Sequence, residues 1–346
     1  MPPHIAWRGG RRCLRGASLD SRDPVSPPLL IQMNIEPELR RVRSADGAVD
    51  LAVWCYRSGG AGVGRDSCDS GPPCLLAHGN GLPARCYEPL IFTLCAAGLS
   101  VFAVDQRGCG HSVLHKTSTE DLKWSRFGDD ILAVVDALRL KTPGAHSRPL
   151  YAFGHSLGGA ACLLAEAHRP GTFDALYLYE PVAAPSVHPG QAHPWEGPLK
   201  VLAGGALKRR AVYPSRDAAR SAFASKPPLS YFHPACLDLY VQHGFEDLGN
   251  GQVTLRCRPE TESAIFWLGM HAGIQPQLGA VTCPVVVAVG ARNINDGPAS
   301  VAPAVVAGVG RGAMQHFSSQ GHLGPLEEPD VVAVAALACF GRHARL

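Results

Sequence analysis

The sequence has little net charge, no long apolar run and no internal repeat. Its 32 Lys and Arg residues nearly balance 29 Asp and Glu, so the formal net charge is only +3, too small to indicate a nucleic-acid partner or an anionic surface. No stretch approaches the roughly 18 consecutive apolar residues that a membrane-spanning helix needs, and Val331–Phe340 is about half that length. These absences favour a globular protein without a nucleic-acid partner or a membrane span.

Metal-binding and disulfide motifs are also scarce. The 12 cysteines include no CxxC pair and most stand inside apolar stretches, which predicts reduced, buried thiols. Cys68 and Cys74 flank a loop of Gly, Asp and Ser and could form a disulfide. The 15 histidines show no ligand spacing such as HExxH, so no metal is expected.

The first 32 residues differ from the rest of the chain. They are rich in arginine, contain no acid before Asp20, and include a proline-rich stretch at 24–28. We expect residues 1–32 to form a disordered tail on a cytosolic protein. An organelle transit segment, or sequence upstream of a start at Met33, are the alternatives.

From about residue 39 onward, apolar runs that resemble strands alternate with helical segments. The predicted strands are Leu39–Arg43, Ala48–Tyr56, Cys74–Ala77, Val101–Val104, Leu150–Phe153, Ala175–Tyr179, Pro284–Gly290 and Ala313–Ser318. Helical spacing of apolar residues occurs at Tyr87–Ala97, Trp124–Leu140, Ala160–His168 and Val331–Phe340. The first two strands are predicted to form an antiparallel hairpin. The others are continuously apolar, which predicts an α/β protein whose largely parallel sheet is covered by helices on both faces.

Residues 182–266 break this alternation. The stretch is rich in Pro, His, Lys and Arg and contains only weak helical segments, Ser215–Ala224 and Pro234–Gly244. We interpret it as an insertion that caps the edge of the sheet. Its aromatic residues either pack the cap on the core or line an apolar substrate site.

Ser156 lies between Gly154 and Gly158, directly after a predicted strand and before a predicted helix. A strand that passes at once into a helix needs small neighbours at the sharp turn. The serine then lies at the helix N-terminus, where free N–H groups and the helix dipole favour developing negative charge. This G-x-S-x-G pattern is typical of a nucleophile elbow.

Four motifs extend this interpretation along the chain. In order, they are HGNG at 78–81, DQRGCGHS at 105–112, GHSLGG at 154–159 and GHLGPLEEP at 321–329. With these motifs, the chain resembles the α/β-hydrolase family from about Leu39 to Phe340. The resemblance implies an α/β-hydrolase domain over 33–346, with a mostly parallel sheet and a helical cap. It also implies cofactor-free hydrolysis of an ester, thioester or lactone of a small apolar substrate through an acyl-enzyme.

The resemblance also implies the base and the oxyanion donors. His322 follows the last predicted strand, as the base of the family does, whereas His316 falls inside that strand and is expected to be packed. The backbone N–H groups of Asn80 and Leu157 would form the oxyanion hole. His155, beside the nucleophile, is expected to have a structural role.

The acid is the point at which the sequence departs from the family pattern. Members commonly carry a G-x-x-D arrangement, but here Gly290 is followed three residues later by Asn293, which has no charge to stabilise an imidazolium. Asp296 is one candidate, if its loop bends inward. Glu180, which ends a predicted strand and precedes a proline, is the other. Both remain candidates at this stage.

The uncertain acid motivates one rival function, a hydrolase-like protein that binds a small ligand with little turnover. A second rival is a carbon–carbon bond hydrolase, because that reaction uses the same triad. We expect the protein to be a monomer or a homodimer. A serine esterase acting on a small ester-like molecule is the function that the motifs favour.

Overall fold

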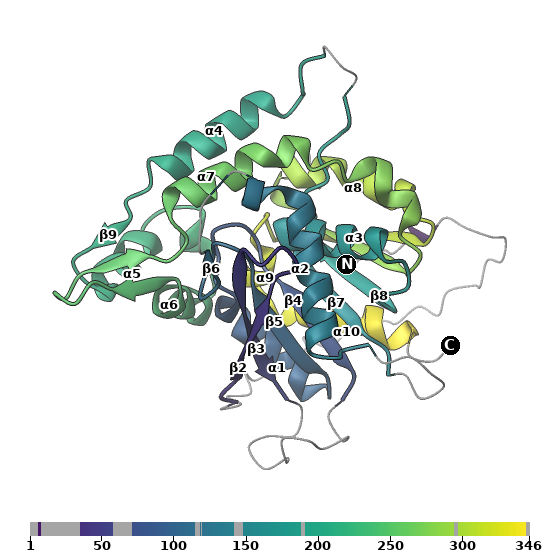
Figure 1. The fold of residues 1–346 in the computed structure, drawn as a ribbon, viewed down its shortest axis with the longest axis horizontal. Coiled ribbons are helices and arrows are strands. Elements are labelled where there is room, and N and C mark those ends of the chain that lie inside the picture. Colours follow the sequence, from purple (N-terminus) through teal and green to yellow (C-terminus); the bar gives the residue numbers. More distant parts are fainter. Residues whose placement is uncertain are drawn as a thin grey trace.

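The computed structural model describes residues 6–7, 35–57, 71–114, 118, 120–141, 148–187, 191–293 and 297–343. These residues form a layered structure around a ten-stranded sheet (Figure 1). The strand order is β1-β13-β12-β8-β7-β4-β5-β3-β2, with β6 pairing with β3. Among the described residues, no helix is long and apolar enough to cross a membrane.

The strands from β13 to β5 are mutually parallel, whereas β1, β2, β3 and β6 pair antiparallel to their neighbours. The bounds are β1 Ala6–Trp7, β2 Glu38–Arg43, β3 Val49–Tyr56, β4 Pro73–Ala77, β5 Ser100–Asp105, β6 Val113–Leu114, β7 Tyr151–His155, β8 Ala175–Tyr179, β12 Val285–Gly290 and β13 Gly312–Phe317. The predicted hairpin is confirmed: β2 pairs antiparallel with β3, and the turn between them uses Gly47 at a φ of +69°.

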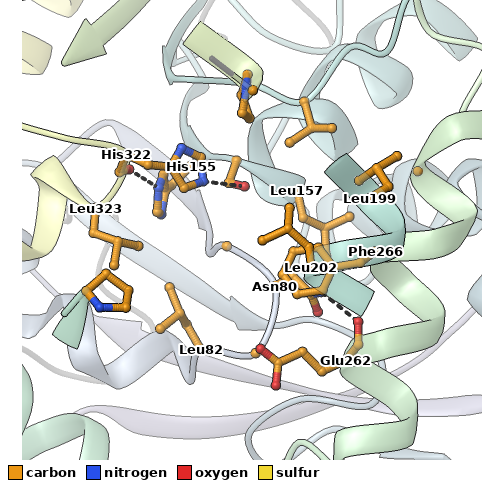
Figure 2. Close-up of a pocket in the computed structure, with 18 of the residues that line it drawn as sticks. Asn80, Leu82, His155, Leu157, Leu199, Leu202, Glu262, Phe266, His322 and Leu323 are labelled. Carbon is orange, nitrogen blue, oxygen red and sulfur yellow. Dashed lines mark hydrogen bonds between the residues drawn. The ribbon is translucent and has the colours of Figure 1, made fainter. Parts of the chain in front are cut away.

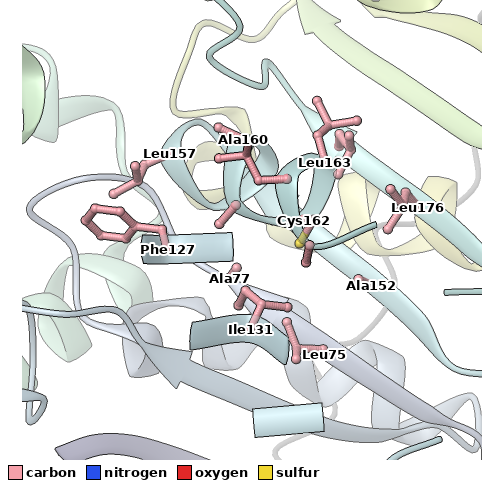
Figure 3. Packing of buried hydrophobic residues seen from close by; sticks show 14 of the residues in the cluster. Leu75, Ala77, Phe127, Ile131, Ala152, Leu157, Ala160, Cys162, Leu163 and Leu176 are labelled. Atoms are coloured by element: carbon pink, nitrogen blue, oxygen red, sulfur yellow. The ribbon is translucent and has the colours of Figure 1, made fainter. Parts of the chain in front are cut away.

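Helices cover both faces of the sheet, as the apolar strands predict. In β4, Leu75 and Ala77 face the cluster beneath α2 (Trp124–Ala137) and α3 (Leu157–His168), shown in Figure 3. Leu76 faces the opposite cluster, beneath α1 (Glu88–Ala96) and α10 (Pro329–His343). This alternation places apolar side chains in two separate cores.

Some predicted boundaries change in the structure. The helix expected at Tyr87–Ala97 is a short 3₁₀ turn, Ala84–Tyr87, followed by α1. The helix expected from Ala160 begins directly after Ser156, and helix α8 (Gly297–Gly308) was not predicted. His316 is exposed rather than packed, because its side chain points away from the face on which Phe317 is buried.

The described cysteines are free and buried, as the sequence predicts. Cys74 is one of these free thiols, and Cys68, its candidate partner, lies outside the described residues. Burial raises the pKa of the Cys55 thiol to about 12, which keeps it protonated near neutral pH. Cys109 and Cys257 have their sulfur atoms 3.3 Å apart as two thiols.

The segment between β8 and β12 folds over the end of the sheet where Ser156 lies (Figure 1). Its elements are α4 Glu196–Leu207, β9 Val212–Tyr213, α5 Arg216–Ala224, α6 Pro234–His243, β10 Phe245–Asp247, β11 Val253–Leu255 and α7 Pro259–Leu268. The weak helical segments predicted here correspond to α5 and α6. The sequence pattern did not indicate α4 or the small antiparallel sheet β10-β11-β9.

Candidate active site

A strained turn holds Ser156 between β7 and α3. Its backbone has a φ of +54°, a conformation that a non-glycine residue adopts only when its surroundings impose it. A Cβ on Gly158 would lie 2.0 Å from the carbonyl oxygen of Ala77, and one on Gly154 would lie 2.7 Å from the Cα of Gly159. The two glycines are therefore required by the close approach of α3 to strands β4 and β7.

His322 reaches Ser156 from the loop after β13. Its Nε2 lies 3.0 Å from Ser156 Oγ, which is hydrogen-bond distance. The serine is 8% exposed, whereas the His322 side chain is 30% exposed, so the serine is the more shielded member of the pair. Two side chains 166 positions apart in the chain are thus in hydrogen-bond contact, the geometry that a nucleophile and its base require.

Glu180 is the carboxylate that contacts the histidine. Its Oε2 lies 2.7 Å from His322 Nδ1, and its other oxygen accepts a hydrogen bond of 2.9 Å from the backbone N–H of Gly290. Glu180 is only 1% exposed and has a φ of +44°, so its position is tightly imposed by β8 and β12. The other candidate, Asp296, lies outside the described residues.

The hydrogen bonds fix which ring nitrogen of His322 carries the proton. Nδ1–H donates to the Glu180 carboxylate, which leaves Nε2 free to accept the proton of Ser156 Oγ–H. This is the tautomer that a general base requires. The hydroxyl, the imidazole and the carboxylate thus form one continuous chain that can move a proton away from the serine.

A buried tyrosine that the sequence analysis missed braces this chain. Tyr87 accepts a hydrogen bond from the Gly79 N–H (3.2 Å) and donates to His155 Nδ1 (2.5 Å). His155 Nε2–H in turn donates to the carbonyl of His322, at 2.8 Å. Burial lowers the pKa of His155 well below its usual range, so it stays neutral. His155 therefore has a structural role, because these hydrogen bonds connect the HGNG loop, the turn at Ser156 and the loop that carries His322.

The HGNG loop lies beside the nucleophile. Gly81 has a φ of +76°, which favours glycine. His78 shapes the loop by donating from Nδ1 to the Gly79 carbonyl (2.7 Å) and accepting the Gln106 N–H at Nε2 (2.8 Å). Asn80 and Leu157, whose backbone N–H groups are the predicted oxyanion donors, both line the cavity that contains Ser156.

This cavity has a volume of about 390 Å³, within the usual range for small-molecule sites. The wall that the cap contributes is mostly apolar and includes Leu199, Leu202 and Phe266 (Figure 2). The apolar lining includes Leu82, Leu157, Trp195, Leu199, Leu202, Leu229, Phe232, Phe266 and Leu323. Such a lining suits an acyl chain or another apolar group attached to a carbonyl that meets Ser156.

One end of the cavity carries charge. Arg209 forms an ion pair with Glu262 and donates a 2.8 Å hydrogen bond to the hydroxyl of Tyr240. Burial raises the pKa of Tyr240 to about 12, and Tyr240 and Glu262 raise the pKa of Arg209 further above its usual value. The charged pair and the neutral phenol form a polar patch within the otherwise apolar cap wall, a feature that sequence reasoning did not find.

The strand order and the helices on both faces of the sheet are those of the α/β-hydrolase fold. A family model described as serine aminopeptidase, S33, matches residues 72–233. Among solved structures, a peroxisomal alpha-beta-hydrolase of Saccharomyces cerevisiae, Lpx1, superposes with a TM-score of 0.69 at 16% identity, covering 90% of this chain and 89% of that one.

Curated relatives match shorter segments. The type I acyl-CoA thioesterase mpaH' of Penicillium brevicompactum is 30% identical over 181 residues, which are 50% of this chain and 40% of that protein. The human monoglyceride lipase is 36% identical over 108 residues, which are 31% of this chain and 34% of the lipase. The chain thus spans 40% or less of the length of the first curated relatives that it matches.

Proposed function

We propose that the protein is a serine hydrolase that cleaves an ester or thioester of a small, largely apolar substrate. The observation that carries this proposal is the hydrogen-bonded chain from Ser156 through His322 to Glu180, which opens onto an apolar cavity. The relatives support the same reaction class, because they are named as monoglyceride lipases and acyl-CoA thioesterases.

In the proposed acylation step, Ser156 Oγ attacks the carbonyl carbon while its proton passes to His322 Nε2. Glu180 stabilises the resulting imidazolium through Nδ1–H. The backbone N–H groups of Asn80 and Leu157 are proposed to donate to the oxyanion. When the tetrahedral intermediate collapses, the carbon–oxygen or carbon–sulfur bond breaks, and the leaving alcohol or thiol takes the proton from His322.

Water completes the proposed cycle. His322 removes a proton from a water molecule as that water attacks the acyl-enzyme, and it returns the proton to Ser156 Oγ as the carboxylic acid leaves. The net reaction consumes one water molecule and regenerates the enzyme. The apolar wall of the cavity would hold the acyl group and exclude other water from the reacting carbonyl.

Hydrolysis of p-nitrophenyl esters by the wild type and by Ser156→Ala tests this function. We expect Ser156→Ala to lose about 10³-fold or more in kcat/KM. Ser225→Ala, which removes an exposed cap serine whose hydroxyl donates to the Ala222 carbonyl in its own helix turn, is the matched control and should retain full activity. A wild-type protein that binds an ester without hydrolysing any would instead favour the binding-protein alternative.

A further inference from the structure

The charged end of the cavity is assembled from three cap elements. Arg209 follows α4, Tyr240 lies on α6 and Glu262 lies on α7. The Glu262 side chain is 8% exposed and that of Arg209 is 24% exposed. Removing a charged pair from water costs free energy, so its position on a substrate cavity, rather than at the exposed rim of the cap, requires an explanation.

Two oxygen atoms at this end have no donor among the described residues. The Arg209 guanidinium engages only Oε2 of Glu262, and nothing in the described part of the chain donates to Oε1. The side-chain amide of Asn80 donates to the Glu262 backbone carbonyl at 3.0 Å, and its own Oδ1 is buried without a hydrogen-bond partner in the same part of the chain. A buried acceptor without a partner costs about 1–3 kcal/mol.

Asn80 and Glu262 both line the cavity that contains Ser156. A Cβ on Gly81 would be 2.7 Å from Glu262 Oε1, so the carboxylate lies against the HGNG loop, as Figure 2 shows for Asn80 and Glu262. Asn80 is also the residue whose backbone N–H is the proposed oxyanion donor. A substrate whose carbonyl meets Ser156 can therefore extend through the same cavity toward Asn80 and Glu262.

We propose that Glu262 Oε1 and Asn80 Oδ1 each accept a hydrogen bond from a hydroxyl group on the alcohol part of the substrate and thereby determine specificity. This inference rests on the proposed hydrolase function. The ligand group must donate hydrogen bonds, because the two atoms only accept. The negative carboxylate disfavours a substrate carboxylate or phosphate at this position, whereas the apolar remainder of the cavity accommodates the acyl chain.

The experiment compares two esters with the same acyl chain. Monooctanoylglycerol carries two free hydroxyls, and propyl octanoate has the same three-carbon alcohol skeleton without them. We expect wild-type kcat/KM to favour the glycerol ester by roughly ten- to a hundredfold, the size of a hydrogen bond to a charged group. The ratio of the two rates does not depend on how much of a variant preparation is folded.

Two variants and one control test the residues. In Glu262→Gln, the amide oxygen can keep the bond to Arg209, so an N–H₂ donor replaces the free acceptor, and the preference should fall about five- to tenfold. Asn80→Leu removes the second acceptor and should lower the preference in the same way. Glu246→Gln removes a carboxylate from an exposed cap ion pair with Arg258 and should leave the ratio unchanged.

A wild-type ratio within about twofold of one, or an unchanged ratio in Glu262→Gln, would overturn this assignment. Either result would leave the proposed function intact provided that both esters are cleaved in a Ser156-dependent manner. An amide N–H is the other donor that could fit. The protein could instead prefer S-octanoyl-N-acetylcysteamine to S-propyl thiooctanoate while showing no preference between the two octanoate esters. That result would assign the two acceptor oxygens to an amide N–H and refute the proposal that they bind hydroxyl groups.

Discussion

Replacing Glu180 by glutamine tests the acid more sharply than any other change. The carboxylate bonds His322 Nδ1 through one oxygen (2.7 Å) and the Gly290 N–H through the other (2.9 Å). A glutamine keeps the second bond with its carbonyl oxygen, which directs its N–H₂ group at Nδ1. The imidazole must then accept at Nδ1 and carry its proton on Nε2, so that it can no longer accept the proton of Ser156.

The expected loss in kcat/KM for Glu180→Gln follows from the lost charge and the wrong tautomer of His322. Opposite charges about 4 Å apart attract by about 4 kcal/mol at an effective dielectric constant near 20, and each 1.36 kcal/mol is a factor of ten in rate. The lost stabilisation of the imidazolium thus accounts for roughly 10³-fold. Because the tautomer is also wrong, we expect Glu180→Gln to lower kcat/KM by about 10³- to 10⁴-fold.

The assay is hydrolysis of p-nitrophenyl butyrate by Glu180→Gln and Asp296→Asn, with thermal unfolding of both variants as the check on folding. We expect Asp296→Asn to stay within a fewfold of the wild type. If Asp296→Asn loses the activity and a folded Glu180→Gln retains more than a tenth of it, the assignment of Glu180 as the acid is refuted.

Three further predictions concern packing at Gly158, the hydrogen bond of Tyr87 and the titration of His243. Gly158→Ala places a methyl group 2.0 Å from the Ala77 carbonyl oxygen and should cost about 3 kcal/mol in urea unfolding; wild-type stability would contradict the close packing of α3 on β4. Tyr87→Phe leaves the acceptor Nδ1 of His155 without a donor and should cost about 2 kcal/mol and lower kcat, whereas an unchanged kcat would remove Tyr87 from the bracing network. Burial lowers the pKa of His243 to about 3, so the unfolded state binds more protons between pH 3 and 6.5. Protonation of His243 in the unfolded state should therefore lower the free energy of unfolding by about 2 kcal/mol as pH falls from 7 to 5. A His243→Gln variant whose free energy of unfolding changes with pH as steeply as that of the wild type would contradict this.

The strands and the sharp turn at Ser156 were predictable because their signals are local. Gly154 and Gly158 indicate a crowded turn, and continuous apolar runs indicate strands that are buried on both faces. The acid was not decidable, because its identity depends on which side chain reaches His322. That depends on β8 lying beside β12, which lets the Gly290 N–H hold the carboxylate of Glu180.

The cap was the least predictable part. Helix α4 contains Gly204, Gly205 and a proline at its start, so its local propensity for helix is weak, and packing against α7 stabilises it. The polar pair in the cavity joins Arg209 to Glu262, which are 53 residues apart. Neither residue belongs to a motif. Only the folded cap brings them together beside Asn80.

The most direct test of the central claim is covalent labelling of the wild-type protein by a fluorophosphonate, followed by mass spectrometry of the modified peptide. We expect one label, on Ser156, at a rate that falls by orders of magnitude in His322→Ala. Labelling at another residue, or no labelling of a folded protein, would contradict an activated serine at this turn.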